Sequence, residues 1–304
     1  MKKVIVRLGN GLGNQLFTYA AAYTFAKNNN AKLYVDDESG FTKRYKYELH
    51  NLNISAEITD AKDKFIGGSG RLKRKILHKI NRFNKNKTFL IEKKDNNKLS
   101  FYDENHLNIN FNNKIYIEGY FQSEKYYKTE KENLQNEFKF KENIMTQENL
   151  FKEKIKNCNS VSIHIRKDKF LSSEGHKNLK DLNKKNFELN LEISKKGVKY
   201  FDKNINEPIY FVWSNDFTGL REFFPSEKFI FVDENLKRDT AYDLYLMSLC
   251  KHFILSPSTM HYWGANLSKN INKICISPIN LITKSGYYGF SNNKDIKADW
   301  WKEI

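Results

Sequence analysis

"KKVIVRLGNGLGNQLFTYAAAYTFAKNNNAKLYVDD", residues 2–37, holds two strand-like apolar runs on either side of one helical run. Residues 2–8 are typical of a short buried strand, and the glycine turn at 9–13 leads into 14–29, whose alanines and aromatics suit a buried helix. Residues 32–37 then return as a strand. This order predicts a βαβ unit, and therefore a parallel sheet with a right-handed crossover.

The second half of the chain repeats this alternation of strands and helices. Strand patterns occur at 160–165, 208–214, 228–233, 252–256 and 273–277, with helical patterns between them, clearest at 239–250 and 259–268. Strands interleaved with helices predict a doubly wound α/β domain. We therefore expect two domains, 1–150 and 151–304, which meet in "KENIMTQENL".

The composition is that of a globular protein of 304 residues, with 39% hydrophobic and 14% aromatic residues. Three widely spaced cysteines offer neither a disulfide framework nor a zinc-binding pair, which indicates a reducing compartment. The apolar run at the N-terminus is too short for a signal peptide, and no stretch approaches the ~20 apolar residues that span a bilayer. We expect a cytoplasmic protein.

The net charge of +16 is concentrated in one segment. Between Asp63 and Glu92 there is no acidic residue, whereas nine residues are basic. Apolar residues at 72, 76, 80 and 83 fall at helical spacing, so the rest of this helix presents cations, most of them within 71–87. The segment could be a solvated face, a patch for the anionic inner face of the plasma membrane, or a nucleic-acid site.

A glycine-rich turn, "GNGLGNQ" at 9–15, joins the first predicted strand to its helix. A dinucleotide fingerprint would need a glycine where Asn14 stands, and a Walker A loop would need a Gly-Lys-Ser/Thr ending that is missing. The free N–H groups and the helix dipole of such a turn suit an anion or a sugar. The alternative is a tight turn in which Asn14 is only the helix N-cap.

Charged residues follow the first strand of the second domain in "VSIHIRKDKF", residues 161–170. Ligands of open α/β sheets bind at the carboxyl ends of the strands, so His164, Arg166 and Asp168 lie where a ligand is expected, on one side of an extended chain. Arginine matches phosphate with a planar fork. The alternative is a structural ion pair between Arg166 and Asp168. We expect no metal here, because the arginine repels a dication.

A third candidate stretch is "LSPSTMHYWGANL", residues 255–267, in which a strand ends at Ser256 and a helix follows. Ser258 and Thr259 offer hydroxyl groups at the helix N-terminus, where phosphate binds readily. Alternatively Ser258 is only a helix cap, and the aromatic residues at 261–263 are core. Together the three stretches predict a nucleotide diphosphate as ligand between the two domains.

Four motifs in the same order resemble those of the bacterial α-1,2-fucosyltransferases, glycosyltransferase family 11. They are "GNGLGNQLFTYAAA" (9–22), "YIEGYFQSEKYY" (116–127), "HIRKDKF" (164–170) and "DLYLMSLCKHFILSPSTMHYWGANL" (243–267). The resemblance runs over the whole chain, with a weak middle at 41–113. It implies a GT-B fold, in which two Rossmann-like domains, an N-terminal acceptor-side domain and a C-terminal GDP-sugar-binding domain, face a cleft.

The resemblance also implies an activity. GDP-fucose would donate L-fucose, with inversion and without a metal cofactor, to a hydroxyl of a glycan acceptor, the family expectation being O2 of a terminal galactose. The product would belong to a surface polysaccharide such as O-antigen lipopolysaccharide, and the acceptor could be lipid-linked. Two other possibilities stay open at this point: another nucleotide-sugar as donor, or a non-catalytic basic protein that binds nucleic acid.

By the same resemblance, Arg166 would stabilise the charge that grows on the leaving β-phosphate, and Asp168 would be the second catalytic residue. The donor-binding positions implied are Gly11, Gly13, Asn14, Gln15, His164, Arg166, Asp216, Asp243, Ser256, Ser258 and Thr259. The family motif His-x-Arg-Arg-Gly-Asp-Tyr has glycine where this chain has Asp168, and aspartate where it has Lys169.

An inverting transfer often uses a carboxylate to remove the acceptor proton. Asp36, Asp37, Glu118 and Asp168 are candidates that the sequence alone does not rank.

Overall fold

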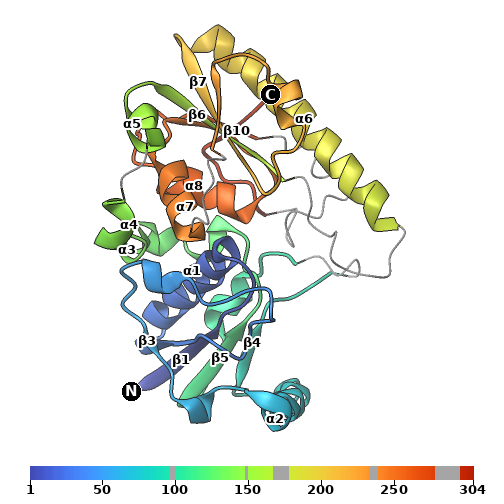
Figure 1. Cartoon of the computed structure of the whole chain (residues 1–304). Helices are drawn as coiled ribbons and strands as arrows, with labels where there is room; N and C mark the ends of the chain where they lie inside the picture. Colours follow the sequence, from blue (N-terminus) through green and yellow to red (C-terminus); the bar gives the residue numbers. More distant parts are fainter. Residues whose placement is uncertain (96–99, 148–149, 167–177, 233–238, 278–294) are drawn as a thin grey trace. The chain divides into compact units, whose positions relative to one another are not determined.

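Two compact units make up the chain. The structure, a computed structural model, describes all residues except 96–99, 148–149, 167–177, 233–238 and 278–294 (Figure 1). Unit 1 comprises Met1–Lys141 and Ser291–Ala298, and unit 2 comprises Glu142–Phe290 and Asp299–Ile304. The first boundary thus falls after Lys141 rather than near residue 150, because the short helices α4 (Glu142–Met145) and α5 (Leu150–Lys156) pack against α7 (Thr240–Leu249) in unit 2.

Unit 1 contains, among its described residues, a five-stranded parallel sheet in the order β3-β2-β1-β5-β4 (Figure 1). The strands are β1 (Lys2–Arg7), β2 (Ala31–Asp36), β3 (Glu57–Ile58), β4 (Phe89–Ile91) and β5 (Lys114–Glu118). The helix α1 (Leu12–Asn28) connects β1 to β2, which pair in parallel from Lys2↔Ala31 to Arg7↔Asp36. The predicted βαβ unit is therefore present.

Both faces of this sheet are covered, as the buried apolar side chains of β1 show. Val4, Ile5 and Val6 are all fully buried, although neighbouring side chains of a strand point to opposite faces. Ile5 packs with aromatic residues of β4 and β5 and with Leu77 of the helix α2 (Gly67–Asn81). A run of consecutive apolar residues is the pattern expected of a strand buried on both faces.

Short helical turns complete unit 1. They are the 3₁₀ turns Leu49–Asn51, Ala61–Asp63, Glu104–Asn108, Glu124–Tyr126 and Lys128–Glu130, and the helix α3 (Lys131–Glu137). Residues 124–137 thus form two 3₁₀ turns and one short α-helix.

Unit 2 contains, within the part of the chain that is described, a six-stranded parallel sheet in the order β11-β10-β9-β6-β7-β8. The strands are β6 (Asn159–Ile165), β7 (Pro208–Ser214), β8 (Phe229–Phe231), β9 (His252–Ile254), β10 (Cys275–Ser277) and β11 (Trp301–Glu303). The other helices are α6 (Asn178–Asn204) and α8 (Thr259–Leu267), with a 3₁₀ turn at Leu220–Phe223. The five predicted strands are present, and β11 is an additional one.

The core of unit 2 lies between this sheet and α6. Val161, Ile163 and Ile254 of the central strands are at most 1% exposed and pack with Leu191 and Phe201 of α6. This packing holds the central strands β6 and β9 in place, and it therefore also sets the positions of the residues that follow them.

Candidate functional site

The carboxyl ends of two adjacent strands in unit 2 bring several predicted site residues together. β6 pairs with β9 through Ile163↔Ile254, so the residues after these positions lie at the same edge of the sheet. His164 and Arg166 come from β6 and its end, and Ser256 follows β9. The sheet edge thus assembles residues that are about ninety positions apart in the sequence.

A buried histidine connects the parts of this edge. His261 of α8 is 0% exposed, and its Nδ1 accepts the backbone N–H of Ser256 at 3.3 Å. Because Nδ1 accepts, the proton of the neutral ring sits on Nε2, which lies 2.8 Å from the Oγ of Ser162 on β6. Sequence reasoning placed His261 only among possible core residues. The feature of the sequence that could have indicated its role is its position, three residues after the serine that caps α8.

His164 is the second histidine of the edge. Its Nδ1 lies 3.2 Å from the Oγ of Ser256, and its ring centroid lies 5.7 Å from that of His261. Burial, together with a smaller contribution from the nearby Arg166, lowers the pKa of His164 to about 3. Burial also holds the pKa of His261 well below its usual value, with His164 contributing. Both rings are therefore neutral at pH 7.

The N-terminus of α8 faces the same edge of the sheet. Ser258 is the N-cap, and its Oγ accepts the backbone N–H of His261 at 3.4 Å. The alternative reading of Ser258 as a helix cap therefore holds, although its hydroxyl hydrogen can still be donated to another acceptor. Thr259 is partly exposed at the first helical position, where backbone N–H groups have no partner within the helix.

The two acidic residues among the predicted donor-binding positions occupy different elements. Asp216 follows β7, the strand beside β6, where its backbone N–H donates to the Oγ of Ser214 at 3.1 Å and its Oδ1 accepts the N–H of Thr218 at 2.9 Å. Asp243 lies in the first turn of α7 and is partly buried. Asp168 lies outside the described residues, as does Lys169.

The glycine turn of unit 1 is held by backbone contacts. Gly11, not Asn14, is the N-cap of α1, so the alternative reading of Asn14 as the helix cap is wrong. A Cβ at Gly9 would lie 2.6 Å from the carbonyl oxygen of Gly40, which explains the need for glycine there. Gly13 is buried in the first turn of α1.

Asn14 and Gln15 have different surroundings. The side chain of Asn14 is partly exposed, and its Oδ1 accepts the Nε2 hydrogen of Gln122 at 2.7 Å. Gln15 is 0% exposed, and its Nε2 donates to the carbonyls of Asn10 and Lys46, both at 2.9 Å. Its Oε1 accepts the N–H of Glu48 at 3.0 Å. Gln15 therefore holds two loops together from inside.

Three of the four carboxylates considered as proton acceptors are engaged within unit 1. Asp36 accepts backbone N–H groups of residues 38 and 39 and the hydroxyl of Ser39, and Asp37 pairs with Lys64 at 2.6 Å. Glu118 forms a two-pronged ion pair with Arg74, and the ring Nε2 of His78 lies 3.3 Å from its carboxylate. Despite the opposing effect of burial, these partners lower the pKa of Glu118 to about 2.

Sequence reasoning missed two buried residues that support the loop after β5. Glu92 accepts the backbone N–H groups of Tyr120 and Phe121 at 2.8 and 2.9 Å. Burial raises the pKa of Glu92 in spite of these hydrogen bonds. Gln122 of the same loop is 2% exposed and contacts Asn14. Only the family-like motif around Gln122 offered a signal, and Glu92 offered none.

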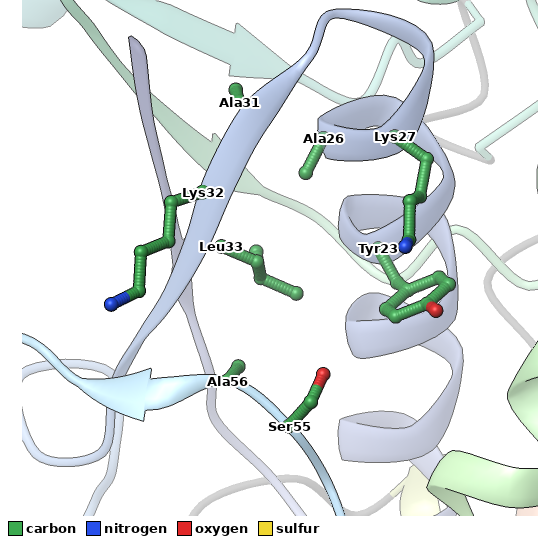
Figure 2. Close-up of a pocket in the computed structure, with 8 residues that line it drawn as sticks. All are labelled: Tyr23, Ala26, Lys27, Ala31, Lys32, Leu33, Ser55 and Ala56. Carbon is green, nitrogen blue, oxygen red and sulfur yellow. The ribbon is translucent and has the colours of Figure 1, made fainter. Parts of the chain in front are cut away.

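A pocket of about 170 Å³ lies elsewhere in unit 1 (Figure 2). Tyr23, Ala26 and Lys27 near the end of α1 line it together with Leu33 of β2 and Ser55. None of the predicted site residues lines this pocket.

The described residues include no group of three or more His, Cys, Asp or Glu side chains placed to hold a metal ion. Within the described part of the chain, no helix is both long enough and apolar enough to cross a membrane.

Sequence relatives match nearly the whole chain. An O-antigen biosynthesis glycosyltransferase of Escherichia coli, WbnK, is 26% identical over 97% of this chain and 98% of its own length. An alpha-1,2-colitosyltransferase of Escherichia coli is 26% identical over 91% of this chain and 92% of its own length.

Solved structures with the same fold include glycosyltransferases from other organisms. The fucosyltransferase NodZ from Bradyrhizobium matches with a TM-score of 0.50 and 12% identity, over 86% of this chain and 91% of that one. A variant of Arabidopsis thaliana FUT1 in complex with GDP matches with a TM-score of 0.51 and 11% identity, over 90% of this chain and 70% of that one. Together with the two parallel α/β units, these likenesses confirm the GT-B fold. The model of the family described as Glycosyl transferase family 11 matches residues 3–303, and the chain therefore belongs to that family.

Proposed function

We propose that this glycosyltransferase moves L-fucose from GDP-fucose, with inversion, to O2 of a terminal galactose in a surface glycan. One observation carries the proposal: Arg166 and the N-terminus of α8 follow the paired strands β6 and β9, beside two neutral histidines. A positive side chain and a helix N-terminus at one sheet edge suit a diphosphate. The O-antigen role named for one relative supports a surface glycan as product.

In the proposed mechanism, the sugar–phosphate bond breaks while negative charge grows on the β-phosphate of GDP. Arg166, the hydroxyl of Ser258 and the first-turn N–H of Thr259 would stabilise that charge. Donors that are already in position cost no reorganisation as the charge develops, which lowers the barrier. Because both histidines are neutral, Arg166 supplies the positive charge at this part of the edge.

The other predicted residues would bind the rest of the donor. His164 and Asp243 are proposed for the guanine side, with Ser256 fixing the ring of His164 through its hydroxyl. Asp216, at the end of the neighbouring strand, belongs to the same proposed donor site, although no role within it is assigned.

From unit 1, the turn at Gly11, Gly13 and Asn14 would contact the donor or the sugar. Gln15, which is fully buried, would act as a positioning residue for that turn.

For proton removal from the acceptor hydroxyl we propose Asp168. The three other candidate carboxylates, Asp36, Asp37 and Glu118, are held in turns or ion pairs. A carboxylate with a pKa of about 2, such as that of Glu118, is a weak base and a poor proton acceptor.

The decisive experiment is a transfer assay with GDP-fucose and a panel of galactosides, with the new linkage identified by NMR. The proposal expects one new α-1,2 linkage and release of GDP, with the Arg166→Ala chain as the inactive control. A product linked at another hydroxyl would overturn the acceptor assignment. Tighter calorimetric binding of UDP than of GDP would overturn the donor assignment.

A second donor needs a direct comparison because one relative is an alpha-1,2-colitosyltransferase. Colitose lacks one hydroxyl that fucose carries, and phosphate contacts do not distinguish the two sugars. The alternative proposal is therefore a GDP-colitose-dependent transferase with the same site. A higher kcat/KM for GDP-colitose than for GDP-fucose, measured with one acceptor, would favour it.

A further inference from the structure

The helix α2 exposes a continuous apolar stripe. Leu72, Ile76, Ile80 and the following Phe83 are 59%, 49%, 46% and 89% exposed. The spacing of four residues places Leu72, Ile76 and Ile80 on one side of the helix, and Phe83 follows three residues later, just beyond the end of α2. We call these four residues the apolar stripe. Figure 1 shows α2 beside β4 at the margin of the unit 1 sheet.

The opposite side of α2 is anchored to unit 1, so the stripe cannot turn inward. Leu77 packs on the cluster of Phe65, Phe89 and Tyr116. Arg74 forms its ion pair with Glu118, and the side chain of Asn81 hydrogen-bonds with backbone groups of residues 88 and 89. The sequence pattern identified the shared face of the four apolar residues, and the structure shows that this face points to solvent.

Exposed cations flank the stripe on both sides. At about 100° per residue, Lys75 and Lys79 fall on one side of the stripe and Lys73 on the other. Arg71 and Arg82 are exposed as well. No acidic residue occurs between Asp63 and Glu92 to offset this charge.

We propose that α2 docks this protein on an anionic lipid bilayer, with the apolar stripe inserted at the level of the headgroups. A helix with an apolar face and flanking lysine and arginine residues binds such a surface, because acyl chains receive the apolar groups while anionic headgroups neutralise the cations. A second copy of this face would bring like charges together. A nucleic acid would neutralise the cations but would leave the aliphatic stripe without a partner.

Vesicle co-sedimentation tests this docking without donor or acceptor, so its result is independent of the proposed reaction. The wild-type chain is expected to bind vesicles of phosphatidylglycerol and phosphatidylcholine in equal parts, and to bind pure phosphatidylcholine at least about tenfold more weakly. Replacing the whole stripe by serine is expected to weaken binding to the mixed vesicles at least about tenfold. The matched apolar control is Leu150→Ser with Ile271→Ser, two residues of unit 2 that are 69% and 94% exposed.

The charge requirement has its own matched pair of variants. Changing Lys73, Lys75 and Lys79 to glutamine should weaken binding to the mixed vesicles and reduce its dependence on salt. The same change at Lys196, Lys199 and Lys203 of α6 removes equal charge from another exposed surface and should leave binding unchanged. Circular dichroism of each variant checks that the fold is intact.

Several results would overturn the proposal. Equal binding to both kinds of vesicle would remove the anionic surface as the partner, and full binding by the serine variant would remove the stripe. A wild-type dimer in sedimentation equilibrium that the serine variant abolishes would assign the stripe to a second copy. Displacement from vesicles by duplex DNA, with tight binding of that DNA by the serine variant, would assign the cations to nucleic acid.

Discussion

The two units treat their buried polar groups in opposite ways. In unit 1, buried carboxylates are charged and paired: Glu118 pairs with Arg74 at the carboxyl end of β5, and Asp63 pairs with Lys3 and Lys114 at the amino ends of β1 and β5. At the carboxyl ends of the unit 2 strands, the buried groups around Ser256 are serines and neutral histidines. A paired charge has little left to offer a ligand, whereas the serines and neutral histidines around Ser256 do not pair with the positive charge of Arg166. The contrast favours unit 2 as the holder of a polyanion.

Removing the guanidinium group of Arg166, which follows strand β6 of unit 2, is expected to have the largest effect. Arg166→Ala is expected to lower kcat/KM for transfer about 10²–10³-fold, because the charge on the leaving phosphate loses its stabilising partner. The melting temperature should change little. Arg221→Ala, which removes an exposed arginine of unit 2 that stacks on Phe231, is the control and should retain activity. Near-wild-type turnover of the first variant would break the comparison.

Breaking a charge pair in unit 1 should affect stability rather than chemistry. Glu118→Gln leaves Arg74 without its carboxylate and is expected to cost about 3 kcal/mol in the free energy of unfolding. Urea titration measures this loss, and transfer by the folded fraction should persist. Complete loss of transfer with unchanged stability would instead make Glu118 the proton acceptor.

The same pair predicts a pH dependence. The pKa of Glu118 is about 2 in the folded chain, against 4.5 for an unperturbed glutamate. Its contribution to stability is therefore present above pH 4.5 and is lost as pH falls toward 2. The Glu118→Gln chain should lack this part of the acid-induced loss, which urea titrations at a series of pH values would measure.

Gln15 and Asn14 are neighbouring amides in the glycine turn of unit 1, and we expect Gln15 to support the turn and Asn14 to bind the donor. Gln15→Ala removes a fully buried side chain with its three hydrogen bonds to backbone groups and should cost about 2 kcal/mol of unfolding free energy. Asn14→Ala removes the contact with Gln122 and should cost less than about 1 kcal/mol, while KM for the donor rises. Thermal melts and initial rates distinguish the two. Equal losses of stability in the two variants would contradict the separate roles of Gln15 in support and Asn14 in donor binding.

A pH dependence in a higher range is expected from the neutral histidines of unit 2. Because the pKa of His164 falls from 6.5 to about 3 on folding, the unfolded chain binds more protons between these values. Stability contributed by the neutral ring is present above pH 6.5 and is lost as pH falls through this window. Between pH 6.5 and 4.5, above the range of Glu118, His164→Gln should show a shallower loss than wild type. The exposed His50→Gln is the control, and an unchanged slope in His164→Gln would contradict the assignment.

Local sequence patterns predicted those parts of the fold whose partners are near in the chain. The βαβ unit at 2–37 and the strands of unit 2 follow from apolar runs and turns within each segment. The strand β11 was not predicted, because three residues at the end of the chain carry no pattern until β10 pairs with them. The exposed side of α2 was also beyond the pattern, since spacing shows which residues share a face and not where that face points.

The candidate site was predictable where residues follow strands, as with Arg166 and Ser256. It was not predictable where a role depends on distant partners. Glu92 supports a loop twenty-eight residues away, and His261 reaches back ninety-nine residues to Ser162. Contacts between residues so far apart in the sequence cannot be predicted from the spacing of neighbouring residues. Gln15 matched a family motif, yet its three hydrogen bonds place it inside the turn.

The return of the chain to unit 1 near its end limits how such proteins can recombine. Asp295 accepts the backbone N–H of Tyr102 at 2.8 Å and pairs with Lys125 at 2.7 Å, after which the chain re-enters unit 2 to form β11. Neither half is a continuous stretch, so a single genetic crossover near Lys141 would separate Asp295 from both partners. A chimaera that keeps each unit whole needs junctions at three places, which makes the two units hard to inherit separately.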